Sequence, residues 1–485
     1  MNHKMIGKII SLILLVEAAF LLPGMGLCLA DGDFGAARAF VYTLGIIGVV
    51  SGALALWSRN TPRGFYAREG MVCVGVSWLM MSAIGCLPFF LSGEIPNYID
   101  ALFEMVSGFT TTGASILSDV ESLPRGILLW RSFSHWIGGM GVLVFLLAIV
   151  PISGRSDGFT MHLLRAESPG PNVGKLVPRM RKTAMILYLL YIALTIVNII
   201  FLLIGRMPLF DAICTAFGTA GTGGFGIKND SIAGYSPYLQ NVCTIFMALF
   251  GVNFTCYYLL LLRQVKSVWK DEELRLYVGT MLGATALIVL NLRGFYPTLH
   301  ETIRHAAFQV SSVMTTTGYS TTDFDLWPSF SKTLLLGLMA MGACAGSTGG
   351  GFKCIRVLLL IKILKRNTFQ VLHPRRVDIV RVNGQRISSS VLESTNAYLA
   401  AYVIILIVST LVISLDEMPF TTNFTAVLSC FNNIGPGLEL VGPTCNFGGY
   451  SALSKLVLIA DMLAGRLEIF PMLALMTKNA WSKWN

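Results

Sequence analysis

Charged residues are scarce in this sequence of 485 residues. Only 13 % of the residues are Asp, Glu, Lys or Arg, whereas 54 % are hydrophobic. A soluble protein carries about 25 % charged residues. Because this chain has too few charges to cover a water-facing surface of its size, we expect lipid to cover much of it.

The sequence also lacks the motifs that carry catalysis or hold a resident metal ion. Its ten cysteines form no Cys-x-x-Cys pair, and its six histidines show neither metal-ligand spacing nor a Ser/Asp triad pattern. The run Gly346–Gly351 is only superficially like a phosphate-binding loop, because Phe352 intervenes before Lys353 and Cys354 follows it. We therefore predict that the chain is not an enzyme and binds no organic cofactor.

Long apolar runs fill most of the chain, and ten of them are continuous or nearly so, among them Ile9–Ala30 and Ala184–Ile204. A helix needs about 20 residues to span the hydrocarbon core of a membrane. The net charge is +10, but Lys and Arg cluster in alternate loops, and the intervening loops hold acids such as Asp100 and Asp211. This positive-inside pattern predicts a multi-pass membrane protein with a cytoplasmic N-terminus. It makes the lipid bilayer, and not a nucleic acid, the expected partner of the basic residues.

Four short segments share one plan, in which an amphipathic stretch too short to span a membrane leads into a polar turn containing glycine. They are Leu102–Gly113, Ala212–Gly223, Ala307–Gly318 and Phe424–Gly435. Thr-Thr-Thr-Gly occurs in two of them, and a spanning helix is expected on either side of each. We therefore predict an all-α polytopic membrane protein with four membrane–pore-loop–membrane repeats around one pore and two extra N-terminal transmembrane helices. The predicted bounds are 1–69 for the extra helices and 70–153, 182–270, 274–368 and 392–485 for the repeats.

Such a constellation is typical of a pore for a monovalent cation. A half-length helix followed by a turn cannot face lipid, because its free N–H and C=O groups would lack partners there. Four such units can surround one axis and point their helix C-termini, each with about half a negative charge, at its centre. Carbonyl oxygens of the turns would replace the hydration shell of the ion, as in a selectivity filter. Glycine supplies the unusual backbone angles that this arrangement needs.

A single Thr-Thr-Thr-Gly turn is more often an ordinary loop or a helix-packing position. Its fourfold repetition, on the acid-bearing side of the membrane, favours a filter. In such a filter these residues are the ligands of the metal cation that passes through. We assign to it Thr110, Thr111, Thr112, Gly113, Ala220, Gly221, Thr222, Gly223, Thr315, Thr316, Thr317, Gly318, Asn432, Asn433, Ile434 and Gly435.

With these turns the chain resembles the TrkH/KtrB family of bacterial potassium uptake proteins, which have four membrane–pore–membrane repeats with one filter glycine each. The resemblance runs from about Met71 to the C-terminus, and the two leading spans are similar to those of the TrkH branch. Supporting stretches are His135–Gly141, Arg165–Pro171 and Gly346–Gly351. Two of the turns depart from Thr-Thr-Thr-Gly, as is usual in the family, namely Ala220–Gly224 and Asn432–Pro436.

The resemblance implies a homodimer in the bacterial cytoplasmic (inner) membrane, in which each protomer moves K⁺ inward through its own pore. It implies a partner as well, a cytoplasmic ring of TrkA-type subunits that bind nucleotides and gate the pore. The gate itself would lie below the filter and consist of an intramembrane loop and an arginine of the last span. The residues assigned to it are Gly346, Ser347, Thr348, Gly349, Gly350, Gly351, Lys353 and Arg466.

Simpler alternatives exist for both parts of this gate. The glycine-rich loop can be a flexible kink, and Arg466 can be a structural partner of Asp461 or Glu468. For the whole chain the rival is an ion-coupled secondary transporter of another solute, but such folds tend to have inverted repeats, whereas all four turns here are expected on one side. A passive channel and symport of K⁺ with H⁺ or Na⁺ are both compatible with the sequence.

Overall fold

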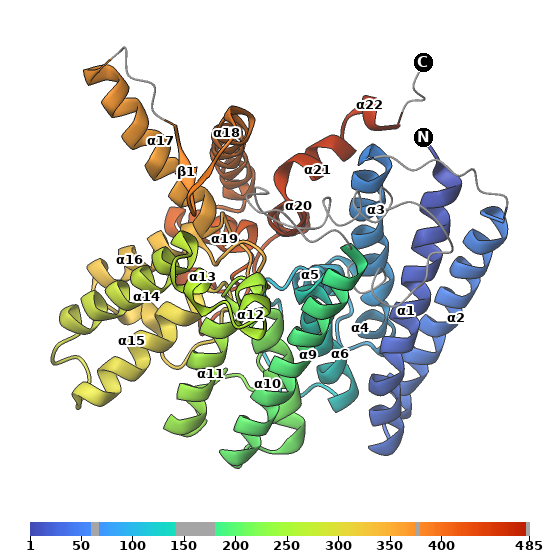
Figure 1. Ribbon diagram of the computed structural model, residues 1–485. Helices are drawn as coiled ribbons and strands as arrows, with labels where there is room; N and C mark the ends of the chain where they lie inside the picture. The colour runs from blue at the N-terminus through green and yellow to red at the C-terminus, as the bar shows by residue number, and fades with distance from the viewer. Residues whose placement is uncertain (60–66, 142–179, 374–378, 482–485) are drawn as a thin grey trace.

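The computed structural model describes residues 1–59, 67–141, 180–373 and 379–481, and these residues are almost entirely helical (Figure 1). Six helices of the described chain are long and apolar enough to cross a membrane, and one further pair passes the same test together although it is bent by 87°. The helical membrane architecture expected from the sequence is therefore confirmed. The sequence did not predict a small antiparallel hairpin, which consists of β1 (Arg381–Val382) and β2 (Gln385–Arg386).

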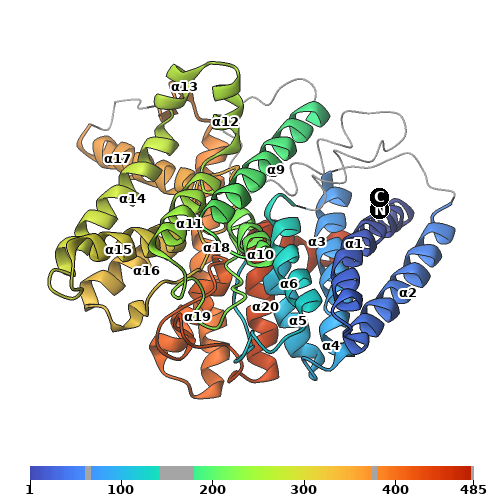
Figure 2. The same cartoon turned by 90° about the horizontal axis from the view of Figure 1, so that it is seen from below.

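Two long helices at the N-terminus pack against each other at one edge of the molecule (Figures 1 and 2). They are α1 (His3–Ala30) and α2 (Phe34–Trp57). A buried hydrogen bond of 2.9 Å joins the hydroxyl groups of Ser11 and Ser51 between them. Both helices contact the rest of the protein: α1 packs against α3 (Ala67–Gly85) and α6 (Arg125–Gly139), and α2 packs against α4 (Leu87–Ser92).

The other helices fall into four groups. Each group contains one helix that leads into a predicted polar turn, and we call these four the short helices: α5 (Tyr98–Phe109), α10 (Leu209–Gly221), α15 (Leu299–Met314) and α19 (Phe420–Phe431). The first group comprises α3 (Ala67–Gly85), α4 (Leu87–Ser92), α5 (Tyr98–Phe109) and α6 (Arg125–Gly139). The second comprises α9 (Met180–Ile204), α10 (Leu209–Gly221), α11 (Pro237–Phe250), α12 (Phe254–Leu261) and α13 (Val265–Trp269). The third comprises α14 (Glu272–Asn291), α15 (Leu299–Met314), the 3-10 helix η1 (Phe324–Leu326), α16 (Ser329–Met341) and α17 (Cys354–Leu372).

The fourth group follows the hairpin and completes the chain. It comprises α18 (Ser389–Ile413), η2 (Ser414–Asp416), α19 (Phe420–Phe431), η3 (Glu439–Val441), α20 (Ala452–Leu467), α21 (Ile469–Leu475) and α22 (Lys478–Trp481). Each short helix begins at a residue suited to a helix N-terminus. The side chains of Asn97 and Thr298 accept hydrogen bonds from the first turns of α5 and α15, and Pro208 and Pro419 precede α10 and α19.

The four groups close into a ring by a repeated helix contact. The helix that follows each short helix also packs against the short helix of the next group: α6 against α10, α11 against α15, and α16 against α19. The ring closes because α20 packs against α5 of the first group. Glycines allow close contacts at these crossings. A Cβ atom on Gly221 of α10, for example, would collide with the carbonyl of His135 in α6.

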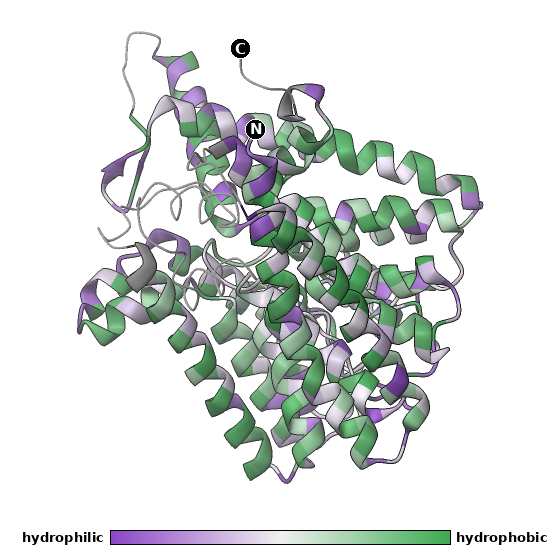
Figure 3. Cartoon of the chain, turned by 90° about the vertical axis from the view of Figure 1, so that its right-hand side faces the viewer, coloured by the Kyte–Doolittle hydropathy of each residue, from purple (hydrophilic) through white to green (hydrophobic). Residues whose placement is uncertain are grey.

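Apolar residues dominate the helix surfaces, and hydrophilic residues gather at helix ends and in connecting loops (Figure 3). The beginning of α1 and the last described helix, α22, lie on the same side of the molecule, at the top of Figure 1, which we call the terminal side. The predicted basic loop around Arg165–Pro171 and the end of the first predicted repeat lie outside the described residues.

Candidate functional site

The four short helices end in turns with the same backbone conformation. In each turn a left-handed non-glycine residue is followed, two residues later, by a left-handed glycine. The non-glycine residues are Thr111, Thr222, Thr316 and Asn433, with φ between 54° and 58°. The glycines are Gly113, Gly224, Gly318 and Gly435, with φ between 76° and 102°. A β-carbon makes this conformation costly, and Asn tolerates it better than most residues.

The second turn is displaced by one residue from the predicted alignment. The amide of Gly223 donates to the carbonyl of Gly218 at 2.8 Å, as the amides of Thr112 and Thr317 do to residues five positions before them. Gly223 therefore corresponds to Thr112, and the equivalent of Gly113 is Gly224, which the sequence prediction left out. The predicted Ala220 and Gly221 still lie in the last turn of α10. The segment contains Gly221, Gly223 and Gly224, so that the sequence alone offered more than one register.

The four turns meet one another at their glycines. A Cβ atom built on Gly113 would collide with the carbonyl oxygen of Gly223, and one on Gly224 with that of Thr317. One on Gly318 would collide with the carbonyl oxygen of Ile434. A Cβ atom on Gly435 would lie 2.9 Å from the carbonyl oxygen of Thr112, which closes the circle. Thus a ring of backbone carbonyls from all four groups surrounds one point, in chain order.

Side chains of the turns are hydrogen-bonded among themselves and to the helices. The hydroxyl groups of Thr110 and Thr112 lie 2.8 Å apart, and those of Thr315 and Thr317 lie at the same distance. The Asn433 amide donates to the Thr112 hydroxyl at 3.0 Å and to the Met462 carbonyl at 2.9 Å. These bonds fix the positions of the turns, and none of them uses a carbonyl of the ring itself.

A cavity of about 130 Å³ opens beside the ring on the side opposite the termini. All four turn glycines line it, together with the segments that leave the first, second and fourth turns. Two cationic side chains, Arg131 and Lys228, are part of its lining. The ring is therefore accessible from this side through a polar mouth.

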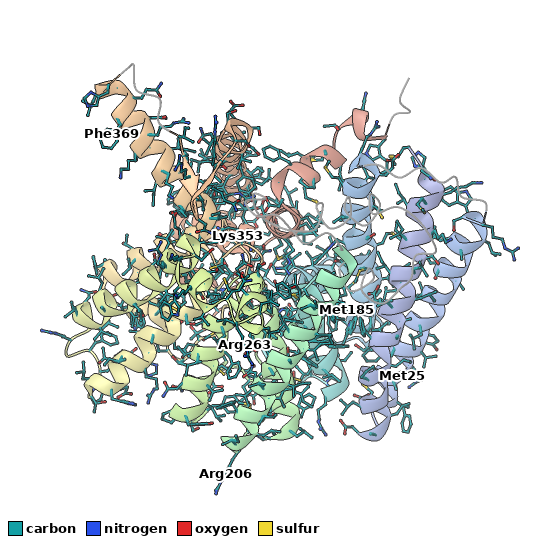
Figure 4. All side chains as sticks on the ribbon, viewed as in Figure 1. Met25, Met185, Arg206, Arg263, Lys353 and Phe369 are labelled. Carbon is teal, nitrogen blue, oxygen red and sulfur yellow. The ribbon has the colours of Figure 1, made fainter. Side chains whose placement is uncertain are left out.

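On the terminal side of the ring, a loop interrupts the helix that would otherwise join α16 to α17. The break runs from Gly342 to Lys353 and is longer than the predicted Gly346–Gly351. Four of its residues are left-handed: Gly342, Gly346, Gly351 and the non-glycine Lys353. Figure 4 shows Lys353 in the middle of the molecule, where its ammonium group donates to the carbonyl of Gly349 within the same loop.

This loop lies directly against two turns of the ring. The amide of Gly350 donates to the hydroxyl of Thr316 at 2.6 Å. Cβ atoms on Gly349 and Gly350 would lie 2.9 and 2.6 Å from the carbonyl oxygens of Thr315 and Asn432. Small residues are thus required here, and a rigid role against the ring fits the loop better than a merely flexible kink.

Arg466 joins the loop to the first group. Its guanidinium donates to the carbonyl of Thr348 at 2.8 Å and to those of Gly138 and Gly139 at 2.5 and 2.7 Å. The two acids that were its alternative partners are bonded elsewhere. Asp461 accepts from the Ser409 hydroxyl at 2.8 Å, and Glu468 pairs with Arg356.

Glu273 is a further residue of this site that the sequence did not single out. One carboxylate oxygen, Oε1, accepts from the amide of Ala345 at 2.6 Å and from that of Ile355 at 3.1 Å. The carboxylate therefore holds both ends of the loop from the first turn of α14. The acidic run Asp271–Glu273 before a long apolar helix was the only sequence signal for it.

The described residues contain no group of three or more His, Cys, Asp or Glu side chains that could hold a metal ion. The candidate site is instead a ring of carbonyls and hydroxyls, which suits a weakly held monovalent cation better than a tightly bound divalent metal.

Comparisons with known proteins find relatives over nearly the whole chain. The family model TrkH, described as a cation transport protein, matches residues 38–483. The chain is 37 % identical to the Trk system potassium uptake protein TrkH of Escherichia coli K12, over 99 % of this chain and 100 % of that protein. It is 32 % identical to the Halomonas elongata protein of the same name, over 100 % of both. The crystal structure of the potassium transporter TrkH from Vibrio parahaemolyticus superposes with a TM-score of 0.85 at 32 % identity, over 98 % of this chain and 99 % of that one.

These matches extend over nearly the whole chain and agree in sequence and in structure. They are to transport proteins and not to enzymes, in agreement with the prediction. The chain therefore belongs to the TrkH family of cation transport proteins.

Proposed function

We propose that this protein takes up K⁺ across the bacterial cytoplasmic membrane through a pore formed by four membrane–pore-loop–membrane repeats. The four helix groups are these repeats, and the ring of turns is the selectivity filter. The observation that carries the proposal is the circle formed by the carbonyls of Thr112, Gly223, Thr317 and Ile434, which brings equivalent backbone groups of four segments to one point. The names of the relatives, which are potassium uptake proteins, support K⁺ as the ion.

The charge of the ring favours a cation. The C-terminal ends of α5, α10, α15 and α19 all converge on it, and each helix end contributes about half a negative charge. The filter in this proposal contains the predicted residues with Gly224 added as the fourth equivalent glycine, and Ala220 and Gly221 belong to the supporting helix. An ion-coupled transporter of another solute is less favoured, because the described cavity at the ring is lined by polar backbone and has no room for a large apolar substrate.

The gate in this proposal consists of the loop 342–353 and Arg466. The loop closes the path on the terminal side of the filter, and the guanidinium adds a positive charge there. The terminal side would be cytoplasmic, in accordance with the positive-inside rule. A homodimer and a cytoplasmic ring of TrkA-type nucleotide-binding subunits complete the proposed assembly, and no nucleic acid takes part in it.

Radioactive Rb⁺ uptake into liposomes that contain the purified protein tests this function. We expect uptake above that of empty liposomes, and competition by K⁺ at much lower concentration than by Na⁺. Uptake that depends on an imposed Na⁺ or H⁺ gradient would indicate symport, and uptake without either gradient would indicate a channel. Folded protein that transports neither Rb⁺ nor K⁺, alone or with its partner subunit, would contradict the proposal.

A further inference from the structure

A buried ion pair lies beside the ring, between α5 and α6. Arg131 Nε is 2.7 Å from Glu104 Oε1, and the two side chains are 3 % and 0 % exposed. An ion pair at such depth is costly to desolvate, and it is retained only where further hydrogen bonds satisfy both groups. Both groups have such bonds here, and these bonds lead to two different turns of the ring.

Glu104 holds the segment that leaves the first turn. Its carboxylate accepts from the Ser115 hydroxyl at 3.0 and 3.1 Å and from the Ile116 amide at 3.0 Å. Ser115 and Ile116 follow Gly113 by two and three residues. The position of the chain just beyond the turn glycine is thus fixed by this carboxylate.

Arg131 holds the segment that leaves the second turn. Its Nη1 donates to the carbonyl of Gly226 at 2.9 Å, and its guanidinium carbon lies 3.5 Å from the ring centroid of Phe225. His135, one helical turn further along α6, stacks on the same ring with a centroid distance of 4.1 Å. Phe225 directly follows Gly224, so that α6 contacts the chain immediately after the glycine of the second turn.

The other three groups have no such pair at the corresponding positions. Glu104 lies nine residues before the turn glycine of the first group. The residues at this position in the other three groups are Thr215, Gln309 and Ala426. Arg131 lies seven residues after the N-cap of α6. At the same distance from the N-caps of α11, α16 and α20 lie Cys243, Leu335 and Leu458. The ion pair therefore makes the ring asymmetric, because it ties only the first turn to the second.

We propose that Glu104 and Arg131 form a clamp that determines ion specificity by fixing the distance between the first and second turns of the ring. This inference rests on the proposed function of the ring as a selectivity filter. Its two hydrogen-bonded ends lie within three residues of Gly113 and Gly224, so that a change in the clamp moves the carbonyls of these turns relative to each other. The pair is neutral overall, and Arg131 can therefore line the mouth without repelling a cation.

The variant Arg131→Lys tests the clamp with the least disturbance to folding. Lysine keeps the positive charge opposite Glu104, but its single ammonium cannot reproduce the planar fork that bonds Glu104 and Gly226 and stacks on Phe225. We expect Rb⁺ flux to persist while the Rb⁺/Na⁺ flux ratio falls by about tenfold, the change in an equilibrium constant that loss of one charge-assisted hydrogen bond produces. Glu104→Gln, which removes the charge at nearly constant size, should lower the ratio in the same way.

A matched control is available on the same helix. Arg125 of α6 pairs with Asp31 at 3.2 Å and lies over the ring of Phe210 at 4.9 Å, but its side chain is 53 % exposed and it contacts no turn of the ring. Arg125→Lys should leave the flux ratio unchanged. Gly318→Ser, which places a side chain on a left-handed residue of the filter itself, serves as the positive control.

The outcomes separate the clamp from the filter. If Gly318→Ser lowers the ratio and Arg131→Lys, purified in folded form, does not, the clamp inference is wrong and the filter stands. If neither variant alters the ratio, the filter assignment itself is wrong. A fall in the ratio for Arg131→Lys but not for Arg125→Lys supports the clamp, and Arg131→Lys alone decides the matter if Glu104→Gln cannot be purified.

Discussion

At the scale of single residues, Arg466 has the clearest consequence for the proposed gate. Its guanidinium stays protonated at every physiological pH, and its bonds to Thr348, Gly138 and Gly139 hold it between the loop 342–353 and the end of α6. Two unit charges about 4 Å apart repel by about 4 kcal/mol at an effective dielectric constant of about 20. A barrier of this size slows passage by roughly a thousandfold.

Arg466→Ala should therefore raise basal Rb⁺ flux in the absence of the partner subunit, by up to roughly a thousandfold and by less where water screens the charge. Liposome flux at equal protein content measures the effect. Lys332→Ala is a suitable control, because it removes a cation that pairs with Asp325 at a partly exposed site, and it should leave basal flux unchanged. Unaltered basal flux in folded Arg466→Ala would mean that this charge does not limit permeation.

At the scale of elements, the loop 342–353 is anchored on the neighbouring helix group as well as on its own. The amide of Cys344 donates to the carbonyl of Gly251 at 3.2 Å, and the carbonyl of Gly346 accepts from the amide of Phe254 at 3.0 Å. Gly251 and Phe254 border the 87° bend between α11 and α12. The break in the third helix group is therefore bonded to the bend in the second, and Glu273 adds the anchor at both loop ends.

Two variants of Glu273 should behave differently. Both loop amides bond to the same oxygen, Oε1, so that Glu273→Gln can keep these bonds. Glu273→Ala leaves the buried amide of Ile355 unpaired, at about 1–3 kcal/mol, and the half-buried amide of Ala345 as well. We expect Glu273→Ala to raise basal flux about tenfold and to lower the unfolding temperature, with Glu273→Gln close to the wild type. Equal flux in all three proteins would show that this anchor does not hold the gate closed.

The sequence predicted those elements whose signal is local. The short helices before Gly113, Gly318 and Gly435 combine an apolar periodicity with a polar turn within twelve residues, and the turns were placed in the correct register. The predicted register of the second turn was wrong by one residue, because Gly223 and Gly224 are adjacent and only the hydrogen bond to Gly218 selects between them. Glu104 and Arg131 were missed for another reason: they are 27 residues apart in the chain, and only the packing of α5 on α6 brings them together.

At the scale of the whole molecule, a chain of polar contacts leads from the terminal side to the loop 342–353, the proposed gate. Lys362 of α17 pairs with Glu272 and donates to the carbonyl of Arg381 in the hairpin. Asn383, at the tip of the hairpin, bonds to Asp271 at 2.7 Å and to Glu272 at 3.0 Å. Since Glu273 is the next residue, a force on α17 or the hairpin acts on the same turn of α14 that holds the gate loop.

The surface where such a force would act is basic. A cavity of about 410 Å³ lies between α17 and the hairpin, and its lining includes Lys362, Lys365, Arg366 and Arg381. The far end of α17, marked by Phe369 in Figure 4, projects away from the helix groups. This face fits an acidic surface of the nucleotide-binding subunit that we propose as the cytoplasmic partner.

The double variant Lys365→Glu/Arg366→Glu should accordingly weaken co-purification with the partner ring. Reversal of two surface charges at an interface replaces attraction by repulsion, and we expect about a tenfold loss of affinity at low salt that shrinks as ionic strength rises. Arg206→Glu/Arg293→Glu is the control with equal charge change, because these exposed residues follow the spans α9 and α14 on the opposite side, where Figure 4 shows Arg206. Pull-down at 50 and 500 mM salt, with basal flux measured in parallel, separates loss of binding from damage to the gate. Binding that is equally strong in both double variants at low salt would place the partner elsewhere on the terminal side.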